Sequence, residues 1–118
     1  MDLIRDLIQA VGEADAKEIL LTGARYSAEE ALAMGLVNRV LPRRRLDAHV
    51  EELARRIAAN APLTVRSIKI ACRELRRPPA ERDLEGVRAA MAACFASDDF
   101  SEGITAFLEK RDPHFKGR

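Results

Sequence analysis

The chain has 118 residues, which suits one small domain with a modest core, because a domain of this size buries only about two-thirds of its unfolded surface. With 47% hydrophobic and 33% charged residues, its composition is that of a soluble helical protein and excludes disordered and collagen-like classes. The net charge of +1 gives no reason to expect nucleic acid or an anionic membrane as a partner. No apolar run approaches the ~20 residues that span a bilayer, and the N-terminus lacks a signal-type apolar core, so we expect a cytoplasmic protein.

The first 23 residues have the pattern of two short helices. Apolar residues recur at helical spacing over residues 3–11, and residues 14–22 form a second helical segment. Gly12 separates the two segments, and Gly23 supplies a stop. We therefore expect a bent or antiparallel helical pair over residues 3–22.

The next segment carries a cap, a short helix and the one strand candidate in the sequence. Ser27 and Glu30 have the spacing of a capping box, in which each side chain accepts from the backbone N–H of the other residue. This predicts a helix over residues 28–34, and Gly35 then supplies a left-handed stop. The alternating, β-branched residues 36–40 predict a short strand.

The rest of the chain predicts four amphipathic helices. Each segment gathers its apolar residues in one stripe, and prolines mark the junctions between segments. Gly86 should weaken the third helix from within, and Ser97 or Asp99 should cap the fourth. These helices are expected near residues 45–59, 62–76, 79–96 and 98–110. The predicted fold class is therefore all-α, with at most one short strand.

Residues suited to metal or nucleic-acid chemistry are present, but not in a functional pattern. Cys72 and Cys94 each have apolar neighbours in helical sequence, which predicts buried, reduced thiols. His49 and His114 lack the spacing of metal ligands, so we expect no metal. Basic runs such as residues 43–45 lack interleaved aromatic residues, which favours solvated helix faces over nucleic-acid binding.

Two stretches have the residues and the order of a family signature. Residues 18–40 read EILLTGARYSAEEALAMGLVNRV, and residues 97–117 read SDDFSEGITAFLEKRDPHFKG. Between them lies Asn60-Ala-Pro-Leu, followed by Lys69. Together these motifs resemble the C-terminal part of the enoyl-CoA hydratase/isomerase (crotonase) family, whose members have an α/β fold and typically over twice this length.

The resemblance implies that this chain lacks the catalytic half of the family fold. The family's oxyanion loops and catalytic carboxylates belong to a strand-helix spiral that would precede residue 1, so no catalytic residue is expected here. Residues 1–42 would form the end of the family's core, and residues 43–118 a helical oligomerisation region. We expect structural, solvated roles for the available glutamates Glu13, Glu18, Glu29 and Glu30.

The resemblance also implies a binding site for coenzyme A on the last helix. In the family, an aromatic residue lies against the adenine and a basic residue lies near phosphate, and the matching positions here are Phe107 and Lys110. Their i, i+3 spacing places them on adjacent parts of one helix face. The alternative is that Phe107 belongs to the core and Lys110 only complements the helix dipole. No cofactor is expected apart from coenzyme A as part of the substrate.

Two functions are compatible with these motifs. The first is a C-terminal fragment of an enzyme that hydrates or isomerises an acyl-CoA double bond, as in fatty acid metabolism, inactive alone and with a separate N-terminal half as a candidate partner. The alternative is a non-catalytic self-association module derived from such an enzyme. The apolar stripes exceed what one small chain can bury, so we expect a homo-oligomer. The resemblance favours a trimer, and a dimer or an exchanged-helix assembly is the alternative.

Overall fold

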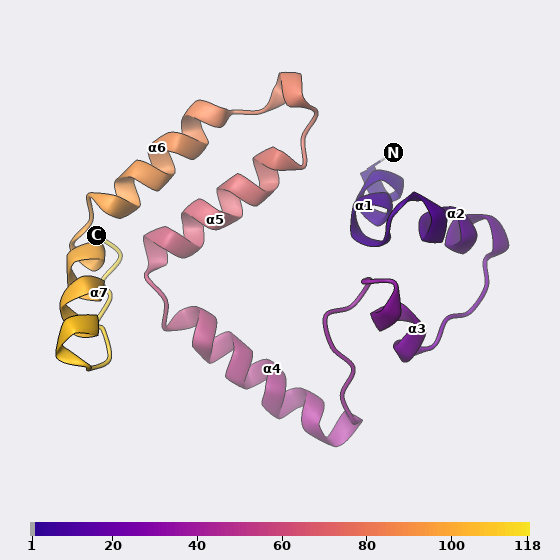
Figure 1. Cartoon of the computed structure of the whole chain (residues 1–118), viewed down its shortest axis with the longest axis horizontal. Coiled ribbons are helices and arrows are strands. Elements are labelled where there is room, and N and C mark those ends of the chain that lie inside the picture. Colours follow the sequence, from indigo (N-terminus) through magenta and orange to yellow (C-terminus); the bar gives the residue numbers. More distant parts are fainter. Residues whose placement is uncertain (1) are drawn as a thin grey trace. The chain divides into compact units, whose positions relative to one another are not determined.

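A computed structural model describes residues 2–118 as a series of helices joined by short connections (Figure 1). No strand occurs within these residues, so the expectation of a mainly helical chain is confirmed. In chain order the helices are α1 (Asp2–Val11), α2 (Glu13–Thr22), α3 (Ala28–Ala33), α4 (Arg43–Ala58), α5 (Pro62–Leu75), the 3₁₀ helix η1 (Pro79–Glu81), α6 (Leu84–Phe95) and α7 (Asp98–Glu109). The chain forms two compact units, one ending at Asp47 and the other beginning at Ala48.

In the first unit, α1 and α2 form the expected pair. Gly12 lies between them with φ 85°, in a region that favours glycine, and its N–H donates to the Ile8 carbonyl at 2.8 Å. Gly23 ends α2 in the left-handed conformation, with its N–H donating to the Ile19 carbonyl. Helices α1 and α2 contact each other, and Ala16 of α2 has no exposed surface.

The capping box at the start of α3 is present, but the strand predicted after it is not. The Ser27 N–H donates to Glu30 Oε2 at 2.7 Å, and the Glu30 N–H donates to Ser27 Oγ at 3.1 Å. The N–H groups of Leu36 and Val37 both donate to the Ala31 carbonyl, at 2.9 and 3.3 Å. Residues 36–40 were wrongly predicted as a strand because these groups close the end of α3 and no other described segment is extended beside them.

In the second unit, α5 and α6 run side by side in opposite directions (Figure 1). The helix predicted over 79–96 is interrupted: η1 is followed by a break, and α6 begins only at Leu84. The break arises because the Asp83 carboxylate caps the new helix, accepting from the Gly86 N–H at 2.7 Å. Gly86 therefore lies in the first turn of α6, and its expected place in a helix interior was wrong.

A buried carboxylate organises the connection between α5 and α6. Glu74 is only 4% exposed and accepts from the Asp83 N–H at 3.1 Å, from Arg77 at 3.0 Å and from Arg73 at 3.2 Å. The Asp83 N–H, followed by Arg77, holds the pKa of Glu74 below its ordinary value. Arg82 donates to carbonyl oxygens at the end of α5, so the connection is held from both sides.

None of the large apolar side chains in the described residues is fully buried. Within the described residues the buried hydrophobic side chains are Ala16 and Ala106, both small. Cys72 is exposed and Cys94 is half-buried, and both are free thiols, so the expectation of burial was wrong for Cys72. No helix among residues 2–118 combines the length and the apolar character needed to cross a membrane.

Candidate functional site

Of the two predicted binding residues, Phe107 lies on helix α7 and Lys110 follows its last residue, and the helix begins at a well-defined cap. Ser97 Oγ accepts from the Phe100 N–H at 3.1 Å and donates to the Cys94 carbonyl at 2.6 Å. Of the two caps proposed from the sequence, Ser97 is therefore the one used. The rings of Phe95 and Phe100 meet edge to face across the junction of α6 and α7, with their centroids 5.3 Å apart.

The second capping candidate, Asp99, has a different role. Its carboxylate is 3% exposed and accepts two consecutive backbone N–H groups of the C-terminal segment, from Lys116 at 2.6 Å and from Gly117 at 2.7 Å. The Asp99 N–H in turn donates to the Arg118 carbonyl at 3.3 Å. The end of the chain is therefore folded back onto the first turn of α7.

Glu102, one turn further along α7, holds the start of the same segment. Its carboxylate accepts from both terminal nitrogens of Arg111, at 2.6 and 2.9 Å, and from the His114 N–H at 2.8 Å. Arg111, and after it the His114 N–H, lowers the pKa of Glu102 to about 2, while the same pairing raises the pKa of Arg111. We refer to Asp99, Glu102 and the segment 111–117 that they bind as the C-terminal latch.

An apolar hollow of about 380 Å³ lies beside the latch. The Phe115 ring lies close to Gly103. The wall continues along α7, which contributes Phe100, Gly103, Ile104, Phe107 and Leu108. The hollow is therefore mainly apolar, and Asp99 of the latch is the charged residue that lines it.

The structure places the two predicted coenzyme A residues together at this end of α7. Phe107 lines the hollow and is 83% exposed, so it is not a core residue of the isolated chain. Lys110 ends the helix in the left-handed conformation, with φ 54° and ψ 43°, and its N–H donates to the Phe107 carbonyl at 3.3 Å. The Lys110 ammonium forms no ion pair with any residue in the range 2–118 that the structure describes.

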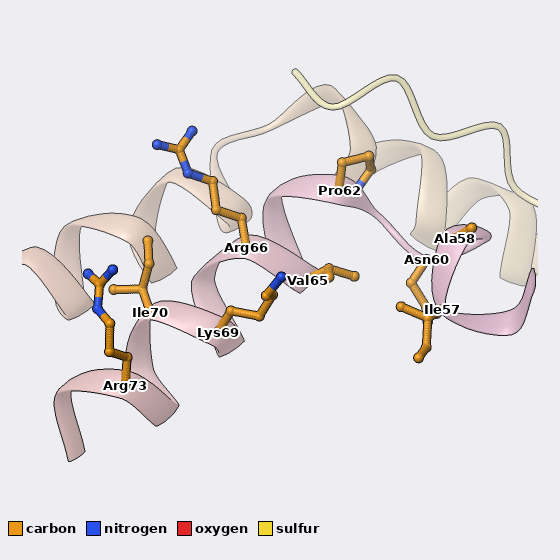
Figure 2. Close-up of a pocket in the computed structure, with 9 residues that line it drawn as sticks. All are labelled: Ile57, Ala58, Asn60, Pro62, Val65, Arg66, Lys69, Ile70 and Arg73. Atoms are coloured by element: carbon orange, nitrogen blue, oxygen red, sulfur yellow. The ribbon is translucent and has the colours of Figure 1, made fainter. Parts of the chain in front are cut away.

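A second candidate site lies where α4 meets α5. Asn60 closes α4 by donating to the Arg56 carbonyl at 2.9 Å, and Pro62 begins α5. Around this corner is an open groove of about 840 Å³, whose apolar part includes Ile57, Val65 and Ile70 (Figure 2).

Three cations of α5, at i, i+3 and i+7, belong to this basic groove: Arg66, Lys69 and Arg73. Figure 2 shows Lys69 extending toward Val65. Arg73 pairs with Glu74, whereas Arg66 and Lys69 pair with no carboxylate in the described part of the chain. The spacing of these three cations was the signal for this groove in the sequence, but no binding site was predicted there, and Lys69 was noted only as part of the family motif.

The sequence profile of the enoyl-CoA hydratase/isomerase family matches residues 3–118, almost the whole chain. The chain belongs to this family. Carnitinyl-CoA dehydratase of Salmonella heidelberg is 38% identical over 109 residues, an alignment that covers 89% of this chain and 42% of that protein.

Solved structures of the enoyl-CoA hydratase/isomerase family contain the same arrangement of helices. An enoyl-CoA hydratase from Bacillus anthracis has a TM-score of 0.86 at 34% identity, and an enoyl-CoA hydratase subunit from Geobacillus kaustophilus has a TM-score of 0.82 at 40% identity. Each alignment covers 98% of this chain and 45% of the other. The chain spans less than half the length of the family members that it matches.

The closing motif of this enoyl-CoA hydratase/isomerase family chain has a structural role that sequence reasoning missed. From this motif the sequence predicted a binding role for Phe107 and Lys110, whereas its acidic residues Asp99 and Glu102 form the C-terminal latch. Two carboxylates one turn apart, followed by a lone arginine and a glycine, were the available signal. Among the other glutamates, Glu30 closes a capping box, Glu13 pairs with Lys17 and Glu18 accepts from the Tyr26 hydroxyl. Residues 2–118 contain no group of three acidic, histidine or cysteine side chains placed to hold a metal.

Proposed function

We propose that this chain forms the C-terminal part of an enzyme that acts on acyl-CoA thioesters, and that it binds the nucleotide end of coenzyme A without performing the chemistry. The observation that supports this function is the exposed Phe107 ring near the C-terminal end of α7, where Lys110, whose ammonium forms no ion pair with described residues, ends the helix. The enoyl-CoA hydratase/isomerase membership supplies the substrate class.

The two side chains suit the two parts of a nucleotide. A flat, exposed ring provides a face on which an adenine can stack, and such stacking contributes about 1–3 kcal/mol. The ammonium of Lys110 can donate to phosphate oxygens, and it forms no ion pair with described residues that would compete for it. The C-terminal end of α7 also presents backbone carbonyls, whose partial negative charge disfavours an anion. The positive charge of Lys110 offsets this effect.

The chemical step would need groups that these residues do not supply. Hydration of an enoyl thioester requires backbone donors for the oxyanion and carboxylates that move protons. Three glutamates of the first unit, Glu13, Glu18 and Glu30, are engaged in caps or pairs as described above, and the two carboxylates of the latch are saturated by the C-terminal segment. Catalysis would therefore depend on a second polypeptide segment that resembles the remaining part of the family fold.

Self-association is the second proposed function, because α6 and α7 expose a broad apolar surface. Large side chains on these helices are between two-fifths and four-fifths exposed, including Met91, Phe95, Ile104 and Leu108. Monomeric proteins rarely expose contiguous apolar patches above a few hundred Å². A trimer remains the favoured assembly, and a dimer or an exchanged-helix assembly is the alternative.

Calorimetric titration of the purified chain with coenzyme A tests the nucleotide site. Phe107→Ala and Lys110→Ala should each weaken binding about tenfold, because each loses one contact of about 1.4 kcal/mol. Phe95→Ala and Lys69→Ala are the matched controls, since they remove an exposed ring and an unpaired lysine elsewhere in the same unit. Loss of affinity in Lys69→Ala, with normal binding in Lys110→Ala, would instead place the nucleotide in the basic groove.

A further inference from the structure

The geometry points to Asp99 and Glu102 as positioning residues: we infer that the C-terminal latch holds Lys110 in its left-handed conformation and so sets where its ammonium lies relative to Phe107. The expected effect on coenzyme A binding rests on the proposed function. The effect of the latch on the Lys110 backbone can be tested without any ligand.

The backbone of Lys110 has an unusual conformation. Lys110 is the one described non-glycine residue with a positive φ, at 54°, a conformation that a residue with a Cβ adopts at a cost. Such a conformation persists where the surrounding structure determines it. The neighbouring contacts of Lys110 must therefore account for it.

These contacts come from the end of α7 and from Glu102, both acting through Arg111. The Arg111 N–H donates to the Ala106 carbonyl at 3.0 Å, which fixes the residue that follows Lys110. The Arg111 guanidinium bridges Glu102, with two bonds of 2.6 and 2.9 Å, and Glu109, at 2.6 Å. Lys110 thus lies between a helix end and an arginine anchored at both sides, which leaves its backbone little freedom.

Asp99 anchors the far end of the C-terminal segment 111–117. Its two carboxylate oxygens take one N–H group each, and the carboxylate itself is almost completely buried. Gly117 lies close to Pro62 at the start of α5, where an added Cβ would be 3.5 Å from the proline ring. With the Phe115 ring held against α7 between the two anchors, residues 111–117 cannot swing away unless both carboxylates release them.

Glu102→Gln tests the inference, with Glu109→Gln as the matched control. Both variants remove one carboxylate that contacts Arg111, but Glu109 makes a single bond and its side chain is 57% exposed, whereas that of Glu102 is 24% exposed. In nuclear magnetic resonance spectra, a left-handed residue has a strong contact between its own N–H and Hα and a distinctive Cα shift. We expect Glu102→Gln to lose this signature at Lys110 and to speed trypsin cleavage after residues 110 and 111 at least tenfold. Glu109→Gln should stay within twofold of the parent chain.

Arg111→Lys provides a second test if Glu102→Gln fails to fold. A lysine keeps the positive charge but cannot form the two parallel bonds to Glu102, so it should also lose the signature at Lys110. Retention of the signature and of trypsin resistance in a folded Glu102→Gln chain, or in Arg111→Lys, would overturn the inference.

Titration with coenzyme A then separates the inference from the proposed function. If both hold, Glu102→Gln should bind about tenfold more weakly than the parent chain while Glu109→Gln binds normally. A parent chain that does not bind coenzyme A would contradict the proposed function, and the Lys110 signature would still decide the positioning role. Normal affinity for coenzyme A in a Glu102→Gln chain that has lost the signature would overturn the inference that the latch positions Lys110 for binding.

Discussion

Two helical glycines of the second unit have different surroundings. A Cβ at Gly86 would collide with the Asp83 carboxylate, which caps α6 by accepting from the Gly86 N–H. A Cβ at Gly103 would lie 3.6 Å from the Phe115 ring, an ordinary van der Waals distance. The glycine next to the latch is therefore the more replaceable of the two, although it belongs to the family motif.

Gly103→Ala should raise the free energy of unfolding by up to about 1 kcal/mol, because alanine favours a helix over glycine by that amount. Gly86→Ala should show no such gain, since it displaces a cap that contributes about 1 kcal/mol and cancels the helix preference. Urea unfolding of both variants at equal chain concentration measures the difference. Equal stabilisation by the two substitutions would mean that the Asp83 cap contributes nothing.

At the scale of the element, α7 and the segment folded onto it should respond to acid. The pKa of Glu102 is lowered to about 2 from an ordinary 4.5, so its carboxylate contributes stability above pH 4.5. That contribution decreases as the pH falls below 4.5 and is lost once the pH passes through about 2. The His114 N–H, which donates to this carboxylate, should report the change directly.

We expect the amide resonance of His114 to shift with a midpoint near pH 2, and we expect this step to be absent in Glu102→Gln. The control is Glu109→Gln, in which the step should remain, because Glu109 does not contact the His114 N–H. A midpoint near 4.5 in the parent chain would show that the carboxylate is not held by Arg111 in solution.

The elements themselves were largely predictable where the signal was local. The capping box of Ser27 and Glu30 and the left-handed Gly35 follow from spacing and chemistry that involve a few neighbouring residues. The missing strand shows the limit: residues 36–40 have strand-forming side chains, but Leu36 and Val37 give their N–H groups to α3. Alternation alone cannot reveal where a backbone N–H finds its acceptor.

The site shows the same limit over longer distances. The sequence placed Phe107 and Lys110 together because they share a helix turn. The partners of Asp99 lie 17 and 18 residues away, and those of Glu102 lie 9 and 12 residues away, so only the folded chain reveals them. Likewise, Glu74 accepts from the Asp83 N–H across the turn before α6. The helical periodicity of the sequence could not predict this contact.

At the scale of the whole molecule, the exposed apolar surface should drive association. Met91 lies on α6 and is 49% exposed, and a charge there would be costly to bury between chains. Light scattering at micromolar concentration should show an oligomer for the parent chain and a lower mass for Met91→Glu. Ala89→Glu is the control, because residue 89 is also exposed but lies on the opposite flank of α6. Equal masses for all three chains, at the monomer value, would mean that these faces remain solvated.

The purified chain should not hydrate crotonyl-CoA above a buffer blank. Loss of one oxyanion donor costs about 100-fold to 1,000-fold in turnover, and the proposed function leaves no complete set of donors and carboxylates in this chain. A spectrophotometric assay of the enoyl thioester measures this. Turnover that survives repurification and disappears on substitution of one glutamate of the chain would contradict the assignment.

The turn between α5 and α6 has a consequence for the kinetics of folding. Glu74 reaches an N–H only nine residues ahead, and the two helices that it joins are adjacent in the sequence, so little loop entropy opposes their pairing. A hairpin closed by such short-range contacts can form before the rest of its unit and serve as a nucleus. Glu74→Gln should then slow refolding while leaving the unfolding rate nearly unchanged, as stopped-flow measurements over a range of urea concentrations would reveal.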